Sequence, residues 1–159
     1  MTSGITPTRV ERDAMRKVAD HALKLHDEGR DIVFTAAIVK DGKIIVQAQN
    51  EVGETGDVSR HAEVVAMARA AEILGDRDLT GCTLLASCQP CEMCLSAARW
   101  AQIDRLIFGA QQENCDAAFF RFPQLRIGDF HRACGGAFDW IGGLEEDRIG
   151  HIYAPGAAE

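Results

Sequence analysis

Three cysteines follow one another at intervals of three residues in the segment CQPCEMC, at positions 88, 91 and 94. Residues three apart in the first turn of a helix face the same side, so Cys91 and Cys94, which follow Pro90, are expected to point together. The partial positive charge at the helix N-terminus favours their thiolate forms. This pair predicts half of a metal site, and the fold has to bring a further ligand to it.

The size and charge of the chain limit its class. A length of 159 residues fits a single domain, 1–159, and no apolar run approaches the roughly 20 residues that span a bilayer. The first residues lack the apolar segment of a secretory signal, which predicts a cytoplasmic protein with no membrane partner. In that reducing compartment, six cysteines indicate metal binding rather than disulfides. A net charge of -7 disfavours a nonspecific nucleic-acid binder, although it leaves room for a local basic groove.

The first part of the chain predicts a helix and a hairpin. Apolar residues recur at helical spacing from Thr8 to about Glu28, and Gly29 then ends the pattern. IVFTAAIVK and KIIVQAQ are rich in β-branched residues and flank Asp41-Gly42, a dipeptide that readily adopts the positive φ angles of a tight turn. Two antiparallel strands are therefore expected.

The middle of the chain alternates helices and strands. A polar loop over residues 50–60 precedes a helix, HAEVVAMARAAEIL, which ends before Gly75. CTLLAS and DRLIFGA are expected strands, with a helix, CEMCLSAARWA, between them, which is typical of layered α/β folds. Residues 111–159 have a mixed pattern that allows a loop with a short helix or a final strand. This segment is expected to contribute to substrate specificity or to dimer contacts.

The segment His61-Ala62-Glu63 at the start of one helix supplies the missing groups. A neutral His61 would complete three protein ligands for zinc, and three ligands leave the fourth position to water, as in catalytic zinc sites. Zinc lowers the pKa of such a water to about 7. Glu63 would be rotated roughly 200° from His61 in a regular helix. His61 is therefore expected at the irregular edge of the helix, with Glu63 placed for general acid and base work.

Three ligand sets compete for the cysteines. An iron–sulfur run would need a further Cys followed by Pro, which neither Cys115 nor Cys134 provides. A four-ligand structural zinc site would use Cys88 together with His61, whereas the open three-ligand site leaves Cys88 out. Cys88 lies before the predicted helix, so we expect it to pack beside the site as a buried apolar residue. We expect structural roles for the other three cysteines, which are Cys82, Cys115 and Cys134.

The order H-x-E and then P-C-x-x-C is the signature of zinc deaminases that act on nucleobases. Over roughly Val10 to Ala110, the chain resembles the cytidine deaminase-like superfamily, and within it the branch of bacterial guanine deaminases and tRNA adenosine deaminases. The resemblance implies a three-layer α/β/α fold with a mixed central sheet. It also implies Zn²⁺ held by His61, Cys91 and Cys94, Glu63 as the proton shuttle, and a homodimer.

Further positions match the substrate pocket of the family. Each has a plain structural alternative, as a core aromatic residue, a turn residue or a helix residue. The chain departs from many relatives at Val33 and Thr35, where they often carry proline and glycine, and at Gln89, where they often carry glutamate. The zinc chemistry should survive these differences, which bear on the shape of the pocket. The positions that the resemblance implies for substrate binding are Phe34, Asn50, Ala62, Trp100 and Asp116.

These observations predict hydrolytic deamination of a small free base or related aminoheterocycle, with release of ammonia. Guanine leads the candidates, and isocytosine, cytosine and ammeline follow. Adenosine in tRNA is the enzymatic alternative and would need a basic groove, to which Arg99, Arg121, Arg126 and Arg132 could contribute. A nonenzymatic zinc-stabilised module is the other alternative. The segment FFRF, with Phe119, Phe120 and Phe122, is expected to be core rather than a cover of the pocket or a subunit contact.

Overall fold

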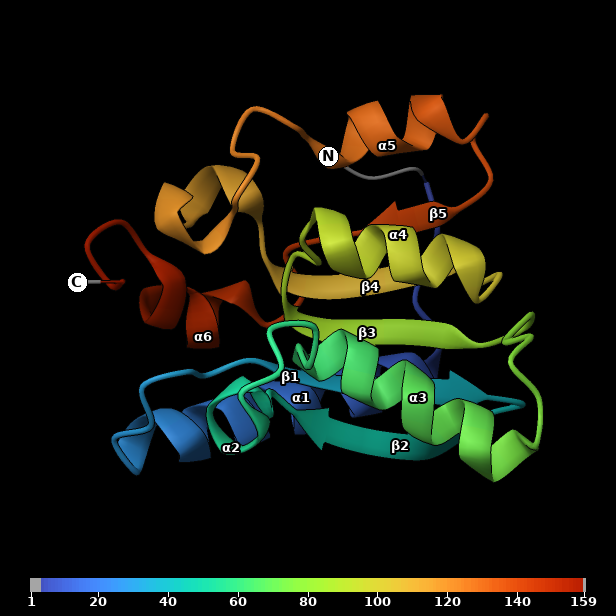
Figure 1. Ribbon diagram of the computed structural model, residues 1–159, viewed down its shortest axis with the longest axis horizontal. Helices are drawn as coiled ribbons and strands as arrows, with labels where there is room; N and C mark the ends of the chain where they lie inside the picture. Colours follow the sequence, from blue (N-terminus) through green and yellow to red (C-terminus); the bar gives the residue numbers. More distant parts are fainter. Residues whose placement is uncertain (1–3, 159) are drawn as a thin grey trace.

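The computed structural model describes residues 4–158, which form helices on both sides of one sheet (Figure 1). The elements follow the predicted order as far as Ala110, with a one-turn helix added in the loop over residues 50–60. The helices are α1 (Arg9–Asp27), α2 (Val52–Thr55), α3 (Ala62–Leu74), α4 (Glu92–Trp100), α5 (Ile127–Ala133) and α6 (Glu146–Tyr153), with short 3-10 helices η1 (Gln112–Asn114) and η2 (Ala117–Phe119). The strands are β1 (Thr35–Lys40), β2 (Lys43–Gln49), β3 (Thr83–Cys88), β4 (Arg105–Ala110) and β5 (Asp139–Ile141).

The sheet has the order β2-β1-β3-β4-β5. Strand β1 is antiparallel to both of its neighbours, whereas β3, β4 and β5 are parallel. Consequently β2, β3, β4 and β5 all run in the same direction. Helices α3 and α4 follow β2 and β3, so both begin at the end of the sheet where these strands finish (Figure 1).

Two local predictions are confirmed at the first hairpin and the first helix. Asp41 and Gly42 have φ values of 51° and 72°, as a tight turn between antiparallel strands requires. Thr8 caps α1 by accepting a hydrogen bond from the Glu11 amide, and the Glu11 side chain accepts one from the Thr8 amide. The polar loop after β2 is more regular than its sequence predicts, because Val52–Thr55 forms α2, which ends at Gly56 with φ 69°.

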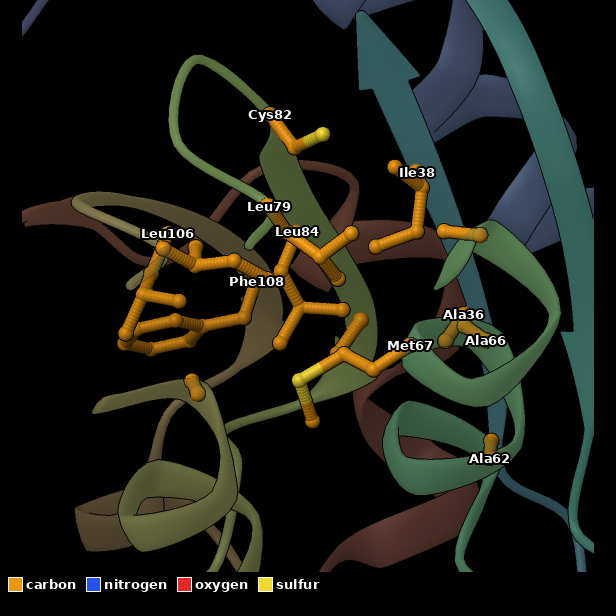
Figure 2. Close-up of a cluster of buried hydrophobic side chains, with 14 of the residues drawn as sticks. Ala36, Ile38, Ala62, Ala66, Met67, Leu79, Cys82, Leu84, Leu106 and Phe108 are labelled. Carbon is orange, nitrogen blue, oxygen red and sulfur yellow. The ribbon is translucent and has the colours of Figure 1, made fainter. Parts of the chain in front are cut away.

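The helices form a layer on each face of the sheet, which confirms the predicted three-layer α/β/α arrangement. Helices α3, α4 and α5 cover one face, where Figure 2 shows Ala66 and Met67 of α3 facing Ala36 of β1 and Leu84 of β3. Helix α1 covers the other face, and α6 joins it there. Both layers are needed because the strands are buried on both faces.

The segment after Ala110 contains both elements that its sequence left open, a short strand and a helix. Strand β5 adds to the edge of the sheet beside β4. Helix α6 packs over Gly109 of β4, where a Cβ atom would lie 2.6 Å from the Ser87 carbonyl oxygen and 2.8 Å from Ile149. Only glycine permits this close approach, which seats α6 on the sheet.

Glu11 is a buried ionised residue that ties α1 to the sheet. Its side chain is 3% exposed and accepts hydrogen bonds from Thr83 Oγ1 (2.7 Å) and from Arg105 Nε (2.6 Å) and a terminal nitrogen of Arg105 (2.8 Å). Burial alone raises the pKa of Glu11, but its bonds to Arg105, Thr8 and Thr83 outweigh burial and lower the pKa to about 2. Since this value lies below the ordinary 4.5, the bonds stabilise the fold fully above about pH 4.5 and lose their effect as the pH falls toward 2.

No helix among residues 4–158 is both long enough and apolar enough to cross a membrane.

We predict that Glu11→Gln lowers the free energy of unfolding at pH 7 by about 2 to 4 kcal/mol, because it leaves Arg105 without its charged partner. The free energy of unfolding should also fall less between pH 5 and pH 3 in the variant than in wild type. Urea unfolding followed by circular dichroism at several pH values measures both effects. Asp13→Asn, which removes an exposed pair with Arg16 on the same helix, should cost less than about 0.5 kcal/mol. Equal effects of the two variants would contradict the role of Glu11.

Candidate active site

His61 occupies the N-cap of α3, with the extended backbone angles φ -64° and ψ 155°. It therefore lies at the irregular edge of the helix, as the sequence predicts. The loop before it is fixed by backbone bonds from Glu51 to Arg60 (3.0 Å) and from His61 to Ser59 (2.9 Å). The His61 side chain makes no capping bond to its helix, so its ring is available to a ligand.

Cys91 occupies the same position in α4, since it is the N-cap and has φ -71° and ψ 173°. Cys94 lies in the first turn and is fully buried, whereas Cys91 is half-buried. Gln89 lies two residues before Cys91. Its backbone amide donates a hydrogen bond to the Ala110 carbonyl oxygen (2.8 Å), which extends the pairing of β3 with β4. The start of α4 is thus held by the sheet next to the start of α3.

The three donor atoms form a compact triangle. His61 Nδ1 lies 3.5 Å from Cys91 Sγ and 3.6 Å from Cys94 Sγ, and the two sulfur atoms are 3.8 Å apart. Tetrahedral zinc, at about 2.3 Å from sulfur and about 2.0 Å from nitrogen, separates two sulfur ligands by about 3.8 Å and sulfur from nitrogen by about 3.5 Å. The triangle therefore fits three corners of a zinc tetrahedron, and these are the residues that could hold the metal.

The three donors of the triangle shift one another's pKa values through their hydrogen bonds. A hydrogen bond from the Cys94 thiol lowers the pKa of Cys91 to about 4, against the opposing effect of burial. The same bond, together with burial, raises the pKa of Cys94. The bond to Cys91 raises the pKa of His61. The site thus favours a thiolate at Cys91 beside a protonated Cys94, and metal binding to both sulfur atoms has to displace the Cys94 proton.

Glu63 lies in the first turn of α3 and is 6% exposed. Burial raises the pKa of Glu63 to about 7, and the negative charge on Cys91 adds to this rise. A hydrogen bond with Cys94 and the charge on His61 act in the opposite direction. The carboxyl group is therefore placed against the donor triangle rather than in solvent.

Cys88 lies outside the triangle, as predicted. Its sulfur is 3.7 Å from the sulfur of Cys115, and both side chains are buried in a core cluster with Phe120 and Tyr153. The described structure therefore favours the three-ligand set over a set closed by Cys88. Cys82 and Cys134 pack in a second core cluster, between the sheet and the layer of α3, α4 and α5, which agrees with the structural roles expected for them.

Phe34 and Asn50 lie together near the triangle. The backbone amide of Asn50 donates to the Phe34 carbonyl oxygen (3.0 Å). The backbone amide of the next residue, Glu51, donates to the carbonyl oxygen of Arg60, which directly precedes His61. Asn50 Oδ1 accepts from the Val52 amide at 2.9 Å, so the oxygen of the side chain is used within the loop. Its NH2 group remains a donor for a ligand. Ala62 is fully buried in the core, so neither its side chain nor its backbone is exposed beside the triangle.

Asp116 and Trp100 have different surroundings from those that the resemblance implies. Both carboxylate oxygens of Asp116 accept backbone bonds, from Ala118 at 2.9 Å and from Gly156 at 2.8 Å, so this residue ties η2 to the C-terminal tail. Trp100 ends α4, at the opposite end of the helix from Cys91, and is 89% exposed. Within this chain, the structure does not bring Trp100 to the donor triangle.

Two aromatic residues beside Phe34 were not assigned to the site from the sequence. Tyr153 of α6 stacks on Phe34 at 5.3 Å, and Phe119 of η2 contacts Phe34 edge-on at 5.6 Å. The Tyr153 hydroxyl donates within the core, where it lies 2.6 Å from the Val33 carbonyl oxygen and 2.8 Å from Ser87 Oγ. Phe34, Phe119 and Cys91 are all half-buried against this same cluster. Tyr153 is the single tyrosine in the chain, and this is the sequence feature that could have drawn attention to it.

Comparison with known proteins gives both a family and relatives. The family model described as "Cytidine and deoxycytidylate deaminase zinc-binding region" matches residues 8–110. Guanine deaminase from Bacillus subtilis (strain 168) is 46% identical over 85 residues, 54% of this chain and 53% of that protein. The chain thus spans about half the length of this relative.

Two further matches cover more of the chain. The tRNA-specific adenosine deaminase of Agrobacterium fabrum is 33% identical over 130 residues, 79% of this chain and 80% of that protein. A solved structure from a study of A-to-I editing by tRNA:A34 deaminases matches with a TM-score of 0.74 and 31% identity, over 88% of this chain and 98% of that chain. The family match contains the whole donor triangle and Glu63, and the superfamily resemblance is confirmed. The chain belongs to the family described by the cytidine and deoxycytidylate deaminase zinc-binding region.

Proposed function

We propose that this deaminase acts on a free aminoheterocyclic base, with guanine as the leading candidate and isocytosine, cytosine and ammeline as others. The observation that carries the proposal is the group of aromatic rings beside Cys91. Phe34, Phe119 and Tyr153 come from three separate parts of the chain and meet within 6.0 Å of one another. Such a group offers an apolar, aromatic wall to a planar ring.

Each polar group of the site has a chemical task in this proposal. Zinc held by His61, Cys91 and Cys94 would supply a water activated for attack at the amino-bearing carbon. Glu63 takes a proton from the attacking water and delivers it to the departing nitrogen, which leaves as ammonia. The NH2 group of Asn50 can donate to a ring nitrogen or carbonyl oxygen and so orient the base.

The charge distribution of the chain supports a small substrate. Arg99 donates to the carbonyl oxygen of Ile103, at the end of α4 far from Cys91, and Arg132 pairs with Asp129. These two of the four candidate arginines are therefore engaged within the protein. The net charge of -7 also works against attraction of a polynucleotide.

Deamination of adenosine in tRNA is the second candidate, supported by the relatives from Agrobacterium fabrum and the tRNA:A34 study. Arg121 and Arg126 are exposed in the segment that follows Phe119 and could contact phosphates. A tRNA substrate predicts steep salt dependence of KM, whereas a neutral free base does not.

We further propose that the enzyme works in the cytoplasm as a homodimer. Two cysteines can bind a metal as thiolates only where they stay reduced, as they do in the cytoplasm. Helices α3 and α4 expose large apolar side chains outside the core, among them Ile73 (60% exposed) and Trp100 (89% exposed). A second copy of the chain would cover this face.

Replacing Glu63 with glutamine should abolish most turnover while zinc remains bound. The variant keeps the shape of the side chain but cannot carry the proton, so we expect kcat to fall by roughly 10²- to 10⁴-fold. Ammonia release and zinc content by atomic emission measure the two properties. Glu72→Gln, at an exposed position of the same helix, is the control and should retain full activity. Undiminished turnover by Glu63→Gln would refute the proton-transfer role.

Substrate choice can be decided by measuring ammonia release from guanine, isocytosine, cytosine, adenine, cytidine, guanosine, ammeline and a tRNA anticodon stem-loop. We expect turnover of one or two free bases, with a KM that changes less than about twofold between 50 and 200 mM salt. Turnover of the stem-loop alone, with a KM that rises steeply with salt, would instead establish the tRNA candidate. Silence on every compound would favour a nonenzymatic zinc module.

Dimer formation should be sensitive to Trp100→Glu, which places a charge in the proposed subunit contact. We expect the mass measured by light scattering at a fixed concentration to fall from that of two chains to that of one. Ile32→Glu introduces the same charge at another exposed apolar position and should leave the mass unchanged. A monomeric wild type would disprove the proposal directly.

A further inference from the structure

Two buried glutamines join the metal-binding loop to the segment that follows β4. Gln89, which precedes Pro90 and Cys91, and Gln112 of η1 are each 6% exposed. Gln89 Oε1 accepts from the Gln112 amide at 3.1 Å, and Gln89 Nε2 donates to Gln112 Oε1 at 3.2 Å. The backbone of Gln89 is held as well, because its amide donates to Ala110.

The pair continues into a second contact that closes a loop. Gln112 Nε2 donates to the carbonyl oxygens of Pro123 (3.3 Å) and Leu125 (3.0 Å). The side chain at the start of the segment 112–125 therefore binds the end of the same segment. Its length falls within the roughly 6 to 16 residues typical of compact surface loops whose ends lie close together.

The hydrogen bonds fix the orientation of both amides. Two carbonyl oxygens face one end of the Gln112 side chain, so that end has to be the NH2 group. The side-chain oxygen of Gln112 then faces Gln89, so the Gln89 NH2 group has to donate to it. The side-chain oxygen of Gln89 is left to accept from the backbone amide of Gln112. A carboxylate at either position would meet an acceptor, and a buried acceptor without a donor is costly. The contact thus requires a neutral side chain that both donates and accepts.

The loop closed by this pair carries one wall of the proposed substrate site. Phe119 lies inside the segment 112–125 and contacts Phe34 at 5.6 Å and Tyr153 at 6.0 Å. The segment is tied at its middle as well, because the Asp116 amide donates to the Tyr153 carbonyl oxygen (2.7 Å). The Gln89–Gln112 pair connects this wall to the residue two positions before the ligand Cys91.

We propose that Gln89 and Gln112 are positioning residues that set the place of the Phe119 wall relative to the metal ligands, and so determine how tightly the substrate binds. The proposal rests on the proposed deaminase site, since the wall matters only if a planar substrate lies against it. The pair acts through Phe119 and touches no reacting atom. Its loss should therefore raise KM and leave the chemical step at zinc nearly unchanged.

The test compares Gln112→Met and Gln89→Met with Gln124→Met, which makes the same change at an exposed position in the same loop. Methionine keeps the length of the side chain and introduces no charge. All proteins are purified with zinc, and zinc content and melting temperature are checked. KM and kcat are measured at a temperature well below melting on the compound that wild type turns over, whether a free base or the stem-loop. Hydrogen exchange of the peptide that covers residues 119–126 reports on the loop directly.

We expect both buried variants to raise KM roughly tenfold, to change kcat less than about twofold, and to speed exchange in residues 119–126. The Gln124→Met variant should match wild type in all three measurements. Faster exchange with unchanged KM would show that the pair is only structural and would overturn the inference. Unchanged exchange in residues 119–126 would overturn it as well. Should one variant fail to fold, the other decides.

If wild type turns over no compound, the proposed function fails separately, and exchange alone then decides whether the pair holds the loop.

Discussion

The direction of the strands is the constraint on which the site depends. Because β1 is antiparallel to both β2 and β3, those two strands run the same way and end at the same side of the sheet. The helices that follow them therefore begin next to each other, and the N-cap residues His61 and Cys91 meet although 30 residues separate them in sequence. Reversal of either strand would place one of the helix starts at the far end of the sheet.

The other side of the site is built by the last third of the chain. Gly109 allows α6 to lie close against β4, and Tyr153 at the end of α6 then supports Phe34 from behind. The same region supplies Phe119 through η2. The candidate metal ligands thus come from the regular α/β framework, whereas Phe119 and Tyr153 of the proposed substrate wall come from the segment after β4, which lies outside the matched family region. Differences in specificity between members of the family are expected to arise there.

The sequence was sufficient for the parts of the site that depend on local spacing. The separation of Cys91 and Cys94 within one helical turn, and the position of His61 before a helix, predict a donor set that the structure brings together. The pairing of Gln89 with Gln112, or of Tyr153 with Phe34, could not be predicted, because it depends on where α6 and η1 dock on the sheet. Trp100 illustrates the same difficulty. Its residue type suits a pocket, but nine helical residues place it at the other end of α4 from Cys91.

Neither His61 nor Cys91 uses its side chain to cap the helix that it begins. The amide groups at both helix starts therefore keep their partial positive charge beside the donor triangle, and a bare divalent cation held there would be repelled. Two thiolates and a neutral imidazole around Zn²⁺ carry no net charge, so this ligand set removes the repulsion. A site with fewer thiolates in the same two helix starts would leave a net positive charge there, and this geometry would disfavour it. The helix ends thus help to explain why this metal centre uses sulfur.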